Sequence, residues 1–236
     1  MAMRHLLPGG RPLIYLALLA ALGISALPAG STTHPVYFAE TAQTVSGRFL
    51  EVWRDGHTYQ ESVAINGYPI SPLHDEVNPT DGKTYRVQWF ERARFEAHPE
   101  VGAPDDVQLS LLGKNAIWDT RRSEPPFQPV SKPGDAGPDL VWFDRTGHTV
   151  RAGFLQFWTK YGGVKQFGYP LSEEFPETSR FDGKEYTVQY FERSRFEWHP
   201  GTAPEFGGVV LGQLGIEQSP YGPRPSPAPS RPAVPR

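Results

Sequence analysis

The stretch DGKTYRVQWFERARFEAHP, Asp81 to Pro99, decides the fold, because the chain repeats it as DGKEYTVQYFERSRFEWHP from Asp182 to Pro200. Fourteen of the nineteen positions are identical. A long repeat at a spacing of about one small domain favours two similar structural units. A doubled signature is also more typical of a binding surface than of an active site, since an enzyme rarely needs its site twice.

The signature has the period of two residues that is typical of β-strands. In the second copy, this period predicts one strand through Tyr190 and Phe191, a turn near Arg193–Ser194, and a return strand that ends before Pro200. On the return strand, Phe196 and Trp198 share one face. The opposite face carries three polar residues, Arg195, Glu197 and His199, which are matched in the first copy by Arg94, Glu96 and His98.

Aromatic residues upstream of each signature recur at helical spacing. Residues Phe154, Phe157, Trp158 and Tyr161 lie at i, i+3, i+4 and i+7, which predicts one buried face of a helix. Thr149 is the expected N-cap, and Gly162–Gly163 is the expected end. In the first unit Phe49, Val52 and Trp53 repeat the pattern, with Gly56 as the stop. The sequence therefore predicts an α+β fold of two small tandem repeats, each a short aromatic-rich helix packed on a β-hairpin or small antiparallel sheet.

The repeats divide the chain into five segments. We expect a signal peptide at 1–30, repeat domain 1 at 34–118, a Pro-rich linker at 119–140, repeat domain 2 at 141–217, and a Pro-rich disordered tail at 218–236. Matching residues are 105 positions apart at the helices and 101 at the signatures, so the first unit carries about four extra residues around His57 to Ala64.

The first thirty residues have the order of a secretory signal. Arg4 and Arg11 precede an apolar run of 15 residues, Leu13 to Leu27, and small residues follow. The run is shorter than the roughly 20 residues of a membrane-spanning helix, although an uncleaved anchor is the alternative. We place cleavage between about Ser25 and Thr33. The sequence thus predicts a secreted, extracellular protein, with the cell wall as a place of association and with no transmembrane span in the mature chain.

Composition narrows the range of partners. Between Ser31 and Ser219, 18 basic residues stand against 26 acidic ones, which gives this part a net charge of −8. A nucleic-acid-binding surface needs a basic stripe, and none is visible, so we expect no nucleic acid partner. The chain has no cysteine, which excludes disulfides and thiol chemistry. No phosphate-binding loop motif is present either, so nucleotide cofactors are not expected.

The segment FGYPLSEE (Phe167–Glu174) beside YFERSRFEWHP (Tyr190–Pro200) resembles the LGFP repeat of secreted bacterial proteins. The resemblance covers the second half of each unit. It implies attachment to the cell envelope, a role that such repeats are thought to have beside catalytic domains. The chain departs from the pattern in two ways: each unit is long, with one set of motifs, and no catalytic domain accompanies them.

Two kinds of chemistry compete with a binding role. The Glu and His of the polar face could contribute to a metal site, but zinc needs three or four ligands and no third one is apparent. We therefore expect an Arg–Glu pair beside a hydrogen-bonded His, with no metal and no cofactor. The alternative is an enzyme, a glycan or cell-wall hydrolase, in which Glu91 or Glu192 would work with a second carboxylate. That carboxylate would follow the GYP turn, the turn predicted at Gly67–Pro69 and at Gly168–Pro170. The available carboxylates are Asp75, Glu76, Glu173 and Glu174.

The hypothesis that we carry forward is a non-catalytic module that binds envelope polysaccharide or peptidoglycan, bivalent through its two repeats. Flat aromatic rings flanked by polar groups suit sugars, although such rings also commonly form the core. The predicted ligand-binding residues are Tyr68, Trp89, Tyr169, Tyr190, Trp198, Glu91, Arg94, Glu192 and Arg195. Trp198 corresponds to Ala97, so the two repeats would not bind identically at that position.

Overall fold

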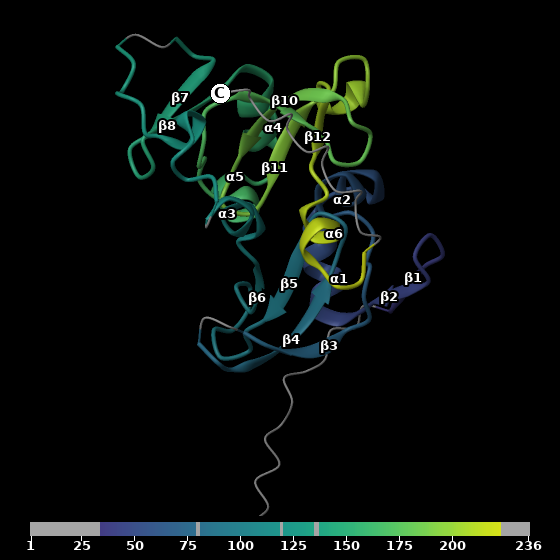
Figure 1. Ribbon diagram of the computed structural model, residues 1–236. Helices are drawn as coiled ribbons and strands as arrows, with labels where there is room; N and C mark the ends of the chain where they lie inside the picture. Colours follow the sequence, from purple (N-terminus) through teal and green to yellow (C-terminus); the bar gives the residue numbers. More distant parts are fainter. Residues whose placement is uncertain (1–33, 79–80, 119, 135–136, 223–236) are drawn as a thin grey trace, which may run out of the picture. The chain divides into compact units, whose positions relative to one another are not determined.

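The computed structural model describes residues 34–222 except 79–80, 119 and 135–136 (Figure 1). The predicted signal peptide and the tail beyond Gly222 lie outside the described residues. Within the described chain the expected α+β fold is confirmed, since each repeat combines short helices with a four-stranded antiparallel sheet and a two-stranded hairpin.

The two repeats have the same order of elements. The first runs through β1 (Val36–Phe38), β2 (Gln43–Val45), α1 (Gly47–Arg54), α2 (Tyr59–Asn66), β3 (His74–Val77), β4 (Thr84–Trp89), β5 (Arg94–Ala97), β6 (Val107–Leu109) and α3 (Leu112–Ile117). The second runs through β7 (Leu140–Phe143), β8 (His148–Arg151), α4 (Ala152–Lys160), α5 (Gly163–Phe167), β9 (Phe175–Thr178), β10 (Glu185–Tyr190), β11 (Arg195–Trp198), β12 (Val209–Leu211) and α6 (Leu214–Gln218). Two 3-10 turns, η1 (Pro125–Phe127) and η2 (Pro204–Phe206), complete the list.

The signature forms the two central strands of each sheet, as its period predicts. In the second repeat β10 pairs with β11 in antiparallel register, with Gln189 opposite Phe196. The aromatic face of α4 covers this sheet, because the Phe154 and Phe157 rings lie edge-on to Phe196 at centroid distances of 5.7 and 5.1 Å. In the first repeat Phe49 of α1 contacts Phe95 in the same way. One apolar helix face on one sheet face therefore forms each core.

Two local predictions need correction or refinement. Thr149 is not the N-cap of α4, because residues 148–151 pair with β7 as a strand and the helix begins only at Ala152, after Arg151. The extra residues of the first unit lengthen a second helix. The unit has the eight-residue α2, closed at its start by a capping box of Thr58 and Glu61, where the second repeat has the five-residue α5.

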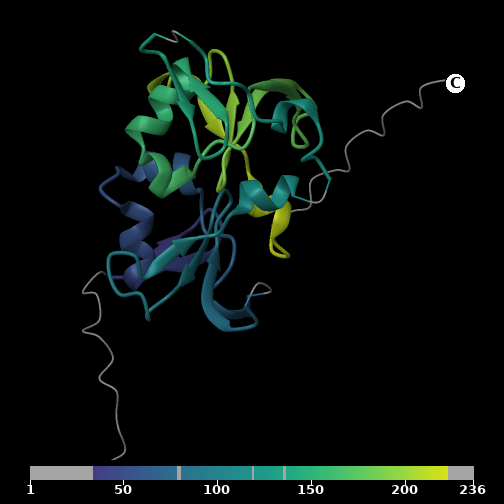
Figure 2. The ribbon, with the colours of Figure 1, turned by 90° about the vertical axis from the view of Figure 1, so that its left-hand side faces the viewer.

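Each repeat ends in a short helix, α3 or α6, which we call its closing helix and which packs against the hairpin turn of the other repeat. The amide of Lys114 in α3 donates to the carbonyl of Glu192 at 3.0 Å, and the amide of Ile216 in α6 donates to the carbonyl of Glu91 at 3.1 Å. Figures 1 and 2 show α6 beside the strands of the first repeat, and α3 and α6 lie side by side. The Gln218 side chain also donates to the carbonyl of Leu112 at 2.8 Å.

Two matched glycines allow each helix to pack this closely on the turn of the other repeat. A Cβ added at Gly113 would lie 1.9 Å from the carbonyl oxygen of Phe191, and one added at Gly215 would lie 1.9 Å from that of Phe90. No side chain fits at such a distance from a backbone atom. The backbones of helix and turn therefore meet directly, and both repeats belong to one compact unit.

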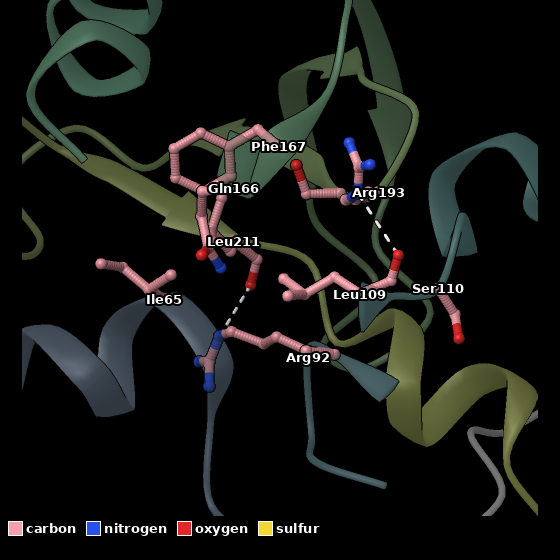
Figure 3. Close-up of a pocket in the computed structure, with 10 residues that line it drawn as sticks. Ile65, Arg92, Leu109, Ser110, Gln166, Phe167, Arg193 and Leu211 are labelled. Atoms are coloured by element: carbon pink, nitrogen blue, oxygen red, sulfur yellow. Dashed lines mark hydrogen bonds between the residues drawn. The ribbon is translucent and has the colours of Figure 1, made fainter. Parts of the chain in front are cut away.

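Matched arginines of the two signatures join the repeats at a small shared pocket (Figure 3). Arg92 Nε donates to the carbonyl of Leu211 at 3.1 Å, and Arg193 Nε donates to the carbonyl of Leu109 at 3.3 Å. Burial lowers the pKa of both guanidinium groups below the ordinary value. Ile65 from the first repeat also joins the core of the second. The contacts are reciprocal, so the pairing has an approximate twofold relation.

The predicted linker is partly packed onto the second repeat. Phe127 is buried among Val188 and Tyr190, and the Arg121 guanidinium bonds to Glu177 and lies 5.6 Å from the centre of the Tyr190 ring. This segment therefore contributes to the core, and the two repeats are not joined by a freely flexible tether along its whole length. No helix in the described parts of the chain has the length and apolar character needed to cross a bilayer.

The glycine contacts generate a stability prediction. We expect Gly113→Ala and Gly215→Ala each to lower the free energy of unfolding by about 1–3 kcal/mol, because the added methyl group must push a helix away from a backbone carbonyl. Gly134→Ala is the matched control, since nothing lies within 4 Å of the added Cβ and its effect should stay within about 0.5 kcal/mol. Urea denaturation measures all three. Equal midpoints for the three variants would contradict the direct backbone contact.

Candidate functional site

The polar face of the second signature is a closed network of charged groups. Arg195 is buried and its Nε donates to Glu197 at 2.9 Å, while one terminal nitrogen donates to Glu217 of α6 at 2.9 Å. The ring of His199 lies 3.0 Å from the other oxygen of Glu197. Burial acts to lower the pKa of Arg195, but its electrostatic interactions with Tyr190 and with the neighbouring carboxylates raise the pKa above its ordinary value. The expected Arg–Glu pair beside a hydrogen-bonded His is thus confirmed.

The first signature builds the same pair. Arg94 donates to Glu96 at 2.7 Å and lies 3.2 Å from Glu76, and His98 lies 2.8 Å from Glu96. Here, however, the network borders a pocket of about 470 Å³, which we call the open pocket. Its lining includes Glu76, Asn78, Trp89, Arg94, Glu96, Gln108, Asn115 and Gln218. The two copies of one signature therefore have different surroundings.

Two substitutions between the repeats, together with a segment that covers the second repeat, account for the difference. Asn115 of α3 stands where α6 has Glu217, so Arg94 has no carboxylate from the closing helix. Ser110 stands where the second repeat has Gly212, and its hydroxyl accepts from Arg94 at 2.7 Å. In the second repeat Arg121 and Phe127 also cover the equivalent surface, through contacts with Glu177 and Tyr190. The residues that correspond to 121–127 would follow Gly222 and lie outside the described residues.

Several of the predicted ligand-binding rings are core residues. Tyr190 is 3% exposed and Trp89 is 7% exposed, so neither offers a free face to a sugar. Burial raises the pKa of Tyr190 to about 12. Tyr68 and Tyr169 are half-buried, and Arg145 lies 5.2 Å from the centre of the Tyr169 ring. The expectation of exposed rings is wrong at both positions. Trp89 packs against Leu112 and Leu214 of the closing helices, and Tyr190 is covered by Ile117 and by Phe127 of the predicted linker.

Trp198 is the predicted aromatic residue that the fold exposes, at 48%. It lies at the end of β11 and lines a pocket of about 390 Å³ together with Arg151, Ala152, Gly153, Phe154, Glu174 and Thr187. Arg151 and Glu174 form an exposed ion pair at 3.3 Å beside it. We call this surface the Trp198 platform. Ala97 takes the matching position in the first repeat, so that repeat has no equivalent ring.

Trp118 is equally exposed, at 48%, but its ring has cationic neighbours. Lys114 and Arg122 lie 4.5 and 4.4 Å from its centre. No such cation lies over Trp198 within the described parts of the chain. The two tryptophans are therefore suited to comparison, because the Trp198 ring is accessible for stacking whereas the Trp118 ring lies beside two cations.

The predicted hydrolase carboxylates support the backbone. Glu91 Oε2 accepts from the amide of Tyr68 at 3.0 Å, and Glu192 Oε2 accepts from the amide of Tyr169 at 3.1 Å. Each carboxylate thus closes the GYP turn, in which Gly67 and Gly168 have φ values of 78° and 80°. Glu173 accepts from the amide and the hydroxyl of Thr149, which ties the β7–β8 hairpin to the sheet.

Two serines that follow the GYP turns also have a structural role. Ser71 and Ser172 are buried, and their hydroxyls accept from the amides of Trp89 and Tyr190 at 2.9 and 3.0 Å. The described chain contains no group of three or more His, Asp or Glu side chains that could hold a metal ion.

Sequence reasoning missed the residues that determine whether each polar face is covered or borders a pocket. Glu76 and Glu177 stand at matched positions, and both bind the signature arginine across the sheet. Their identity in the two repeats was the available signal. Glu217 and Asn115 gave no signal, because their importance depends on where the closing helices pack.

Comparison of the chain with protein-family models, with curated proteins and with solved structures found no match.

The contacts of Glu173 generate a pH prediction. Burial raises the pKa of this carboxyl, but the hydrogen bonds from His148 and Thr149 lower it by more, so the pKa lies below its ordinary value of 4.5. A lowered pKa contributes stability that is present above pH 4.5 and is lost as the pH falls through the folded value. We expect Glu173→Gln to lower the free energy of unfolding by about 1–3 kcal/mol at pH 7. As the pH falls below 4.5, the variant should lose less stability than the unchanged protein.

The matched control for Glu173 is its neighbour. Glu174→Gln removes only the exposed pair with Arg151 and should change the free energy of unfolding by less than about 1 kcal/mol. Urea denaturation across the acid range measures both variants. An unchanged pH dependence in Glu173→Gln would show that this carboxylate does not couple protonation to folding.

Proposed function

We propose that the protein is a secreted, non-catalytic module that binds the polysaccharide of a cell envelope, peptidoglycan included. The observation that carries the proposal is the Trp198 platform: an indole ring 48% exposed beside a pocket of about 390 Å³. An exposed ring offers a flat apolar surface on which a sugar ring can stack. The adjacent Arg151 and Glu174 supply donors and acceptors for its hydroxyl groups.

The shape of the platform favours a polymer over a small free ligand. The pocket lies at the end of a strand, and its lining comes from β8, the start of α4, β10 and β11. A shallow site that holds one or two sugar units gains little affinity for a free monosaccharide. An insoluble chain with many equivalent units presents the site with a high local concentration of ligand.

The proposed site is one platform in the second repeat, not two equivalent sites. Trp198 has Ala97 as its counterpart, and the first repeat packs on the second. Binding therefore does not depend on avidity between two like sites on a flexible linker. The resemblance to envelope-attached LGFP repeats supports the same partner class. A hydrolase that used Glu91, Glu192 or Glu173 gains no support, because these three carboxylates accept hydrogen bonds from backbone amides of the fold.

The test is co-sedimentation of the protein with insoluble peptidoglycan and polysaccharide preparations. We expect Trp198→Ala to weaken binding about tenfold or more, because a stacked indole at the centre of a site contributes at least about 1.4 kcal/mol. Trp198→Phe should keep part of the affinity, since it preserves an aromatic face.

Trp118→Ala is the control, because it removes an equally exposed indole whose ring already has cationic neighbours. Its binding should match that of the unchanged protein. If the unchanged protein sediments with none of these matrices, or if Trp198→Ala and Trp118→Ala weaken binding equally, the proposal fails.

A further inference from the structure

We propose that the open pocket of the first repeat is a second binding site, specific for a small neutral polyhydroxy compound such as a free sugar or polyol. It differs from the Trp198 platform in lining, in depth and in ligand size. This proposal does not rest on the function of the platform, and either site can exist without the other.

Arg94, which lines the open pocket, is only partly bonded. Arg94 is 7% exposed, and its Nε is buried with no hydrogen-bond partner among the described residues. The other nitrogens of the guanidinium are engaged by Glu96, Ser110 and Glu76. A buried donor without a partner costs about 1–3 kcal/mol, so the guanidinium of Arg94 is less fully bonded than the lining around it could allow.

The second repeat is an internal reference for this interpretation. The equivalent nitrogen, Nε of Arg195, donates to Glu197 at 2.9 Å, and Glu217 binds the same guanidinium. The same signature in the same fold can thus satisfy its arginine completely. The first repeat differs because Asn115 replaces this carboxylate, and Asn115 lines the open pocket.

The lining selects the chemistry of the ligand. Two carboxylates, Glu76 and Glu96, stand against the single cation Arg94, which gives the lining a net charge of −1 and disfavours an anion. A hydroxyl group can accept from Arg94 and donate to a carboxylate oxygen, so neighbouring hydroxyls match both requirements. The amides of Gln108 and Asn115 line the same pocket.

The volume of the open pocket agrees with a small ligand, and Trp89 beside it can report binding. A pocket of about 470 Å³ falls within the range of about 300–1,000 Å³ that is typical of small-molecule sites. Trp89 lies on the wall, with its indole Nε1 donating to Glu76 at 3.1 Å and Arg94 lying 5.4 Å from its ring centre. A ligand that binds Glu76 or Arg94 therefore changes the surroundings of the Trp89 indole proton.

The experiment follows the Trp89 indole resonance by NMR on the full chain while glucose, glycerol or glucuronate is added. We expect the resonance to shift in a saturable way with glucose and glycerol, and at least about tenfold more weakly with glucuronate because of the charge of the lining. The Trp198 indole signal, recorded in the same spectra, reports the platform separately.

The deciding variant is Asn115→Glu, which copies the second repeat. Asn115 is exposed, so the folded core is left intact, and the new carboxylate should occupy Arg94 as Glu217 occupies Arg195. We expect the Trp89 response to glucose and glycerol to be lost. Asn115→Gln is the control, since it adds length without charge, and it should keep the response. The proposal is overturned if neither neutral probe shifts Trp89 saturably, if glucuronate binds as well as glucose, or if Asn115→Glu leaves the response unchanged.

Discussion

The direct contact between two glycines and two backbone carbonyls is the constraint on which the rest of the structure depends. Gly113 lies against the carbonyl of Phe191 and Gly215 against that of Phe90, each so closely that a methyl group would not fit. Because of these contacts, each closing helix lies between the repeats, and Glu217 and Asn115 come to lie beside the signature arginines. The same packing buries Leu112 and Leu214 against Trp89, which removes that ring from the surface.

This packing gives the two copies of the signature different surroundings. One copy is a fully bonded structural unit, in which Arg195 has Glu197, Glu177 and Glu217 around it. The other copy keeps the pair of Arg94 and Glu96 but lines a pocket. Duplication thus supplies a stable frame for two different surfaces: an exposed tryptophan in the second repeat and a polar pocket in the first.

Patterns of short range predicted the fold well. The spacing of Phe154 and Phe157 predicted α4, and the alternation through Val188 and Phe196 predicted the central hairpin and its two faces, because both depend on neighbours within one element. The accessibility of the rings could not be predicted in the same way. Tyr190 is buried by Phe127, which lies 63 residues earlier, and no local pattern contains that contact. The signal for the exchange of helices was present but weak, in the matched positions of Gly113 and Gly215.

The central claim is that the two signature arginines differ in how fully they are bonded, and exchange of their Nε protons with water, measured by NMR, tests it most directly. Arg195 Nε donates to Glu197 at 2.9 Å, so we predict slow exchange for its proton. Arg94 Nε is buried without a hydrogen-bond partner among the described residues, so burial alone protects its proton and we predict faster exchange than for Arg195. Equal protection of the two protons would contradict the account, because it would mean that both copies of the signature are closed.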